Sequence, residues 1–205
     1  MSISRLGRAR ARAVAKPRPD GATAAYVLPP TATSPALLEK GSDRRFRTLV
    51  NDLFTIASRM EVVRAHLGRR MGISGPQYSL LIAVAHLQGV RGVSVGAVAQ
   101  AMHVSSAFIA AETGKMAKLG LLLKRANPDD RRGVLISLAP AGRLKLNGIS
   151  KEIRAINDLF FGALDAASFA ALSAAAQALV AGSGRAVHYV KAVESDALSA
   201  AHAAE

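Results

Sequence analysis

The residues best suited to chemistry in this sequence form one short polar segment. Residues 127–133 read Asn-Pro-Asp-Asp-Arg-Arg-Gly, between strand-like runs at 121–125 and 134–138. Asparagine, proline, aspartate and glycine are typical of tight turns, so the pattern predicts two short strands joined by a hairpin tip. Arginines that project from a hairpin suit insertion into the minor groove of DNA, because that groove concentrates negative potential. The segment therefore predicts contact with a polyanion.

The charge of the whole chain agrees with such a partner. The 27 Lys and Arg residues outnumber the 14 Asp and Glu residues, and the formal net charge is +13. This excess predicts attraction to polyanions but does not choose among DNA, RNA and an anionic membrane. Between residues 94 and 145, eight basic residues oppose three acidic ones. The positive charge is thus concentrated around the predicted hairpin.

Other kinds of chemistry find little support. Cysteine is absent, which excludes disulfides, thiolate catalysis and thiol-based redox sensing. The histidines show no metal-binding spacing, so ordinary surface or core positions are favoured over a metal site assembled in three dimensions. These histidines are His66, His86, His103, His188 and His202. We predict no cofactor, no metal and no enzymatic activity.

Two amphipathic helices precede the hairpin. Ser94 can cap the first, and His103-Val104-Ser105 is the turn before a second helix over 106–119, which Gly120 ends. On the second helix, Ile109, Thr113, Met116 and Leu119 fall on one side. The opposite side carries Ala107, Ala110, Ala111, Gly114 and Lys118, with Ser106 and Lys115 at its edges. Small residues more often form a packing surface than a DNA surface, but the adjacent hairpin favours DNA.

Longer helices flank this unit. An apolar residue recurs every three or four positions over 44–71, a helix too long for one small core, so part of it should contact a second subunit. Ser74 and Pro76 begin a buried helix over 77–88. After the hairpin we expect one helix from Pro140 through Leu164 and another that Asp165 caps.

The two ends read as tails. Residues 1–43 are rich in arginine and proline and predict a disordered arm; residues 193–205 predict a flexible tail. The arm is a solvated tail, a source of extra phosphate contacts or an organellar transit peptide. No apolar run approaches the roughly 18 to 20 residues that span a bilayer, so we expect a soluble, cytoplasmic protein with no membrane partner.

At the hairpin the sequence resembles the MarR family of bacterial transcriptional regulators, named for multiple antibiotic resistance. The resemblance rests on Leu119-Gly120-Leu121, Lys124-Arg125, residues 127–132, residues 134–138 and Gly142-Arg143. It covers about residues 44–192, with a DNA-binding lobe at about 74–138 and dimerisation helices at about 44–71 and 140–192. The implied fold is mainly α with a small two- to three-stranded β-wing, a winged helix-turn-helix.

The family pattern assigns roles to residues. It implies that Asp130 orients Arg132 for the minor groove, with Arg131 as the neighbouring candidate, and that the 106–119 helix reads the major groove. The implied DNA-binding residues are Ser105, Ser106, Ala107, Ala110, Lys115, Lys118, Asp130, Arg131 and Arg132. The chain departs from the family at Ala139, where a helix-capping threonine is usual, and in its Ala- and Gly-rich recognition helix.

The resemblance also implies an effector site between the dimerisation helices and the lobe, often for small aromatic acids or related anions. The candidate lining residues are the polar groups on these otherwise apolar helices, Arg64, His66, Tyr78 and His86, although surface charge and a core tyrosine are the simpler explanation. The resulting hypothesis is a homodimeric repressor of a pseudo-palindromic operator on double-stranded DNA, released by a small ligand. The rivals are an architectural DNA-binding protein without an effector and a small-molecule enzyme on a helical scaffold.

Overall fold

A computed structural model describes residues 26–202, without the side chains at 131, 132, 198 and 200–202. Most of the predicted basic arm, residues 1–25, lies outside the described part. The chain divides into two compact units, residues 1–54 and 55–205, which are described separately below. Helix α1 (Arg44–Met71) begins in the first unit and ends in the second.

The first unit contains local structure ahead of α1. A 3₁₀ turn, η1 (Pro35–Leu37), precedes the buried Asp43. One carboxylate oxygen of Asp43 accepts hydrogen bonds from the Thr31 amide and hydroxyl, at 2.6 and 2.8 Å, and the Arg47 guanidinium pairs with the other. The Thr31 hydrogen bonds, and then Arg47, hold the pKa of Asp43 below its ordinary value. Residues 31–43 therefore form a closed loop where the sequence predicted a disordered arm.

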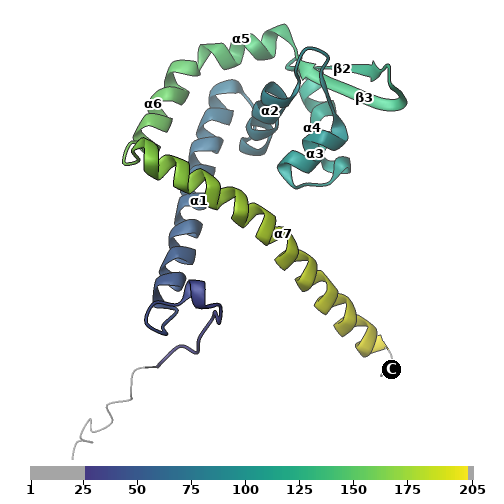
Figure 1. Cartoon of the computed structure of the whole chain (residues 1–205). Coiled ribbons are helices and arrows are strands. Elements are labelled where there is room, and N and C mark those ends of the chain that lie inside the picture. The colour runs from purple at the N-terminus through teal and green to yellow at the C-terminus, as the bar shows by residue number, and fades with distance from the viewer. Residues whose placement is uncertain (1–25, 203–205) are drawn as a thin grey trace, which may run out of the picture. The chain divides into compact units, whose positions relative to one another are not determined.

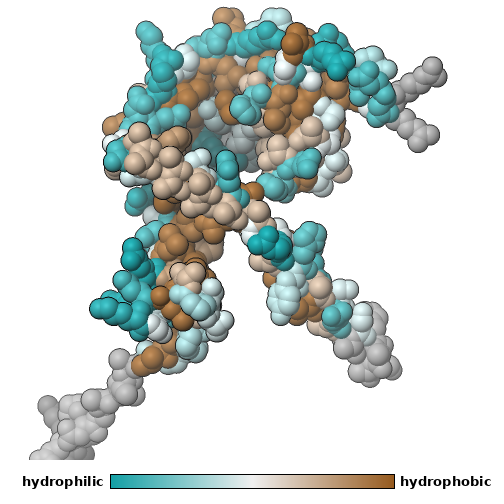
Figure 2. Space-filling model, in the orientation of Figure 1, coloured by the Kyte–Doolittle hydropathy of each residue, from teal (hydrophilic) through white to brown (hydrophobic). Residues whose placement is uncertain are grey.

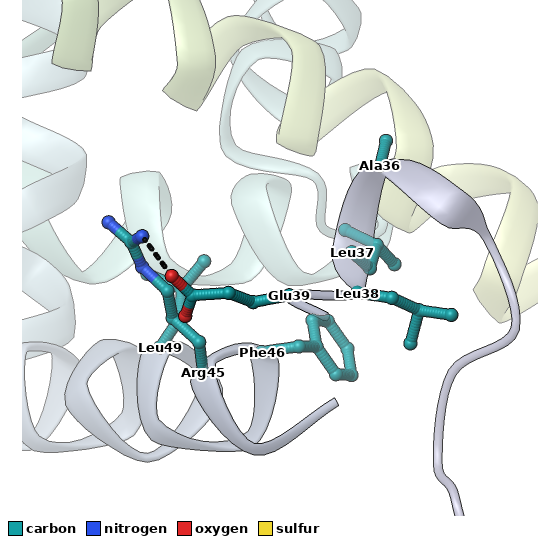
Figure 3. Close-up of a pocket in the computed structure, with 7 residues that line it drawn as sticks. All are labelled: Ala36, Leu37, Leu38, Glu39, Arg45, Phe46 and Leu49. Carbon is teal, nitrogen blue, oxygen red and sulfur yellow. Dashed lines mark ion pairs between the residues drawn. The ribbon is translucent and has the colours of Figure 1, made fainter. Parts of the chain in front are cut away.

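An apolar groove lies between η1 and the start of α1 (Figure 3). Leu38, Phe46 and Leu49 contribute apolar side chains to it, and Glu39 and Arg45 form an exposed ion pair at 3.5 Å. Leu49 remains 49% exposed. The groove therefore leaves apolar surface in contact with solvent.

The second unit holds the winged helix lobe. Its order is α2 (Gly75–Leu87), β1 (Val93–Ser94), α3 (Val95–Met102), α4 (Ser106–Lys118), β2 (Leu122–Asn127) and β3 (Asp130–Leu138). The strands form an antiparallel sheet in the order β1-β3-β2, and the β2–β3 hairpin projects from the lobe (Figure 1). The predicted fold class, mainly α with a small β-wing, is confirmed.

One apolar core joins the helices of the lobe to its sheet. Leu80, Val98, Ile109, Met116 and Ile136 are each 0% exposed and come from α2, α3, α4 and β3. Leu67 and Met71 add the end of α1 to the same cluster. Because these side chains come from α1, all three helices of the lobe and β3, burial fixes α4 and the hairpin to one support.

Local capping signals set the helix starts. Ser74 accepts a hydrogen bond from the Gln77 amide while the Gln77 side chain accepts one from the Ser74 amide, a complete capping box. Ser94 and Ser105 cap α3 and α4 more simply, because each side chain accepts a hydrogen bond from a backbone amide, that of Ala97 or Phe108. The predicted caps at Ser74 and Ser94 are confirmed.

The C-terminal helices differ from the prediction. The expected single helix from Pro140 through Leu164 is two helices, α5 (Pro140–Gly148) and α6 (Ser150–Phe161), because the backbone leaves the helical region at Ile149, with φ −101° and ψ 4°. Asp165 does cap α7 (Ala166–His202), accepting from the Ser168 amide at 2.7 Å. The helix continues to His202, so residues 193–202 are helical where we expected a flexible tail.

Helix α7 has no buried residue between 166 and 197. Phe169, Leu172, Leu179, Val187 and Val190 are each between 46% and 61% exposed, and residues coloured as hydrophobic follow the helix in Figure 2. Ala166–Ala197 is long and apolar enough to cross a membrane by length and composition, contrary to our prediction. A single such helix is weak evidence for a membrane, because a soluble helix that packs against another helix can meet the same criterion.

Candidate nucleic-acid interface

The turn between α3 and α4 depends on one strained residue. His103 has a left-handed backbone, with φ 53° and ψ 41°, and Val104 donates from its amide to the Ala99 carbonyl at 3.1 Å. A non-glycine residue in this region is uncommon, and the packing of α3 on α4 holds it there. The turn sets the angle between α3 and α4.

Helix α4 has one anchored face. Ile109, Thr113 and Met116 are 0% exposed, and the Thr113 hydroxyl donates to the Ile109 carbonyl at 2.7 Å. Leu119, which the sequence placed on this face, is 57% exposed. It follows the last helical residue, where the chain turns toward Gly120, whose φ of 69° confirms the predicted left-handed cap.

The opposite face of α4 is open to solvent. Ser105, Ser106, Ala107, Ala110 and Lys118 are all exposed. Lys115 is exposed too, but its ammonium group pairs with Glu112 at 2.6 Å. All the α4 residues that the sequence proposed for DNA contact therefore lie on the accessible part of the helix or beside its N-terminal cap.

A hydrogen-bonded bridge that the sequence analysis missed fixes α4 to α2. The Gln77 side chain donates to one oxygen of Glu112 at 2.9 Å, while Lys115 donates to the other. These hydrogen bonds, Lys115 first, lower the pKa of Glu112 below its ordinary value. Glu112 is only 14% exposed at its side chain. The capping residue of α2 thus also positions the middle of α4.

The hairpin is longer and tighter than predicted. Asn127 pairs with Asp130, so only Pro128 and Asp129 form the tip, and the Asp129 amide donates to the Asn127 side chain at 3.1 Å. A Cβ at Gly133 would lie 2.8 Å from a carboxylate oxygen of Asp130. A side chain at position 133 would therefore displace the Asp130 carboxylate.

The cations of the hairpin are distributed over both strands. Lys124 and Arg125 are exposed on β2, and the Lys124 ammonium lies 3.5 Å from the Ala110 carbonyl of α4. Arg131 and Arg132 belong to β3, and their side chains lie outside the described part, so the pairing of Asp130 with Arg132 stays a prediction.

One further arginine joins the hairpin from outside it. Arg91, in the loop before β1, lies 3.4 Å from the Asp129 carboxylate, and both side chains are largely exposed. Sequence spacing gave no sign of this contact, because the two residues are 38 positions apart. Arg91 places a further positive charge beside the tip of the hairpin.

A separate cavity of about 220 Å³ lies within the second unit, among α1, α2 and α6. Of the four predicted effector residues, Arg64 and Tyr78 line it. Arg64 donates to Ser79 at 2.5 Å and pairs with Glu61 at 2.6 Å. Tyr78 is 7% exposed, and burial raises its pKa. The other lining residues are mainly apolar, with Asn157 as a further polar group that the sequence analysis missed.

The remaining two candidates do not line this cavity. The His66 ring pairs with Glu152 of α6 at 2.6 Å, and Arg70 donates to the second oxygen of Glu152 at 3.0 Å. These contacts lower the pKa of Glu152, His66 contributing first. His86 is exposed on α2. The structure therefore gives His66 a place in an ion cluster and separates both histidines from the cavity.

A helix-turn-helix followed by a β-hairpin, on one core, defines a winged helix protein. Residues 71–133 match the MarR family. The described domain has the fold of solved MarR-family transcriptional regulators. A comparison with curated proteins gave no match.

Solved structures with this fold share little sequence with the chain. The transcriptional regulator SlyA aligns with a TM-score of 0.59 at 13% identity, over 69% of this chain and 98% of its own. A mutant of MarR from E. coli in complex with operator DNA aligns at 0.56 and 14% identity, over 66% and 95%. The complex of S. aureus MepR with DNA aligns at 0.54 and 14%, over 64% and 96%.

Proposed function

We propose that this protein is a sequence-specific, DNA-binding transcriptional regulator. The observation that carries the proposal is the exposed outer side of α4 beside a hairpin rich in cations, with Lys118, Lys124 and Arg125 all open to solvent. Phosphate contacts from such cations fix a protein on the duplex, while the helix reads base edges in the major groove. That two solved structures of the same fold contain DNA supports this use of the surface.

The same proposal includes a homodimer. Helix α7 leaves a row of apolar side chains exposed, among them Phe169, Leu172 and Leu179. A second copy of this chain would cover that row, because apolar residues at steps of three and four are typical of helix pairs. A two-fold dimer presents two recognition helices about 34 Å apart and so binds a pseudo-palindromic operator.

The third part of the proposal is control of DNA binding by a small ligand. The cavity beside Arg64 and Tyr78 lies between α1, which leads into the lobe, and α6, which leads to α7. A small, largely apolar ligand with one polar or anionic group fits this lining. Such a ligand would act by favouring a dimer geometry in which the recognition helices no longer match the operator. We propose repression that the ligand releases, in the cytoplasm, at the nucleoid.

The test is binding of the full chain to duplexes selected from a random library, measured by fluorescence anisotropy over a range of salt concentrations. A regulator should prefer its selected duplex by at least about 10³ over random DNA. Its affinity should fall by about 0.9 log unit per log unit of salt for each phosphate contact. An architectural DNA-binding protein would show the salt dependence without the preference. A flat salt slope would exclude this electrostatic mode of binding.

Two substitutions test which part of the proposed interface contributes more to DNA affinity. Arg132→Ala should weaken binding more than Lys118→Ala, because the proposed minor-groove contact is more specific than a phosphate contact. Arg185→Ala, on α7 and outside the winged helix, is the matched control and should leave the affinity unchanged. The opposite order of the first two effects would mean that α4 and not the hairpin dominates binding.

A further inference from the structure

The part of α4 that faces solvent is chemically unusual for a helix that reads DNA. Its residues other than Ser106 and the two lysines are Ala107, Phe108, Ala110 and Ala111, which are exposed, and Gly114, which is partly buried. We call these five residues the recognition face. None of their side chains can donate or accept a hydrogen bond. Direct contact with the polar edges of guanine, cytosine or adenine would therefore leave those edges without partners, which is unfavourable.

Most polar side chains at the start and in the middle of α4 are already engaged. Thr113 is buried and bonds to the backbone of its own helix, and Glu112 is held by Gln77 and Lys115. The Ser105 hydroxyl accepts the Phe108 amide as the helix cap. Within α4, which the structure describes in full, Ser106 and Lys118 are the polar side chains that have no hydrogen-bond or ion-pair partner.

Lysine side chains border the recognition face. Lys115 and Lys118 follow it on α4, and Lys124 reaches across from β2 to the Ala110 carbonyl at 3.5 Å. Lysine ammonium groups at this border suit the phosphates on either side of a groove. A recognition face that is apolar and bordered by lysines fits a polyanion that carries an apolar group between its charged groups.

Phe108 is the large apolar side chain at one edge of the recognition face. It is the third residue of α4, in the first turn, and it is 38% exposed. The first turn of a recognition helix is the part that contacts base edges. The sequence analysis assigned Phe108 to neither side of the helix. Ile109, the next residue, is buried, as the helical spacing predicted.

We propose that the recognition face reads thymine methyl groups and that Phe108 is its specificity-determining residue. Thymine is the one DNA base with a methyl group in the major groove, and alanine and phenylalanine side chains contact it favourably. This inference rests on the proposed function. It predicts that the selected operator places at least one thymine per half-site opposite the first turn of α4.

The experiment changes the DNA before it changes the protein. Duplexes selected by the full chain are resynthesised with each thymine replaced singly by deoxyuridine, which removes only the methyl group. At the thymines that the helix contacts, each substitution should weaken binding about fourfold, the effect of one buried methylene. Substituting the symmetric pair should weaken it about 15-fold.

Protein variants then assign the methyl contact. For Phe108→Ala, the ratio of the two affinities, thymine over deoxyuridine, should fall toward one at the position that the ring contacts; Phe108→Leu should retain most of it. Lys118→Ala is the control: it should weaken both duplexes by the same factor and leave the ratio unchanged.

The outcomes are distinguishable. Equal binding of thymine and deoxyuridine duplexes at every position overturns this inference, while a preference for the selected duplex over random DNA still supports the proposed function. A ratio that Phe108→Ala does not change overturns the role of Phe108. No preference for any duplex would contradict the proposed function itself.

Discussion

Helices α4 and α7 use their apolar residues in opposite ways. The 13 residues of α4 bury three side chains at 0% exposure, and the other elements of the lobe surround them. Helix α7 has 37 residues and none buried between 166 and 197. The contrast shows that the winged helix lobe has a core of its own, whereas α7 leaves its apolar side chains exposed.

The largest expected effect is a loss of stability of the winged helix lobe. Ile109→Ala removes a fully buried side chain and should lower the free energy of unfolding by about 2 to 5 kcal/mol. Urea denaturation followed by circular dichroism measures it. Leu119→Ala, at the exposed end of the same helix, is the matched control and should cost about 0.5 kcal/mol or less. Equal losses would show that Leu119 is in the core, as the sequence had suggested.

The next effect concerns α7. Leu172→Glu with Leu179→Glu places two charges on its apolar row and should convert the dimer to monomer in sedimentation. Operator affinity should fall about 100-fold or more, because each half-site then binds separately. Ala174→Glu with Ala181→Glu, at the same spacing on the other side of the helix, should change neither quantity. Monomer formation by the control pair would show that a different face of α7 forms the dimer.

A smaller effect separates stability from binding within α4. A Cβ at Gly114 would meet nothing within 4 Å, so Gly114→Ala should stabilise the helix by about 1 kcal/mol. The same methyl group would keep the helix backbone away from a groove, and operator affinity should fall. Gly184→Ala in α7, which also has open space, should leave affinity unchanged. Tighter binding by Gly114→Ala would mean that this part of α4 does not approach DNA closely.

The smallest effect is a pH dependence. Because its folded-state pKa lies below the ordinary 4.5, Glu152 stabilises the fold above that pH, and this contribution is lost as the pH falls through the lowered value. Glu152→Gln should therefore lower the Tm at pH 7, and the difference from the parent should close in acid. Glu194→Gln on α7 is the control, with no such difference. A gap that persists at low pH would show that the carboxylate charge is not what stabilises the pair with His66 and Arg70.

Signals within a few residues of each other were readable without the structure. Ser74, Ser94 and Asp165 cap helices, and Gly120 adopts the left-handed conformation, because each depends only on its own neighbours in the chain. The turn chemistry of residues 127–133 likewise predicted the hairpin. The site residues on α4 could be proposed because helical spacing separates its two faces.

Contacts across the fold could not be read in the same way. Gln77 meets Glu112 across 35 positions, Arg91 meets Asp129 across 38, and His66 meets Glu152 across 86. No local pattern encodes such pairs, since they depend on how the elements pack.

What the sequence determined by itself is therefore the order of helices and strands, their caps and the positive charge around the hairpin. The tertiary structure decided which side of each helix is used. It exposed Phe108 and Leu119, and it separated His66 from the cavity that Arg64 and Tyr78 line. The physical reason is that capping and turn formation involve neighbouring residues, whereas burial is shared among all the elements that meet in one core.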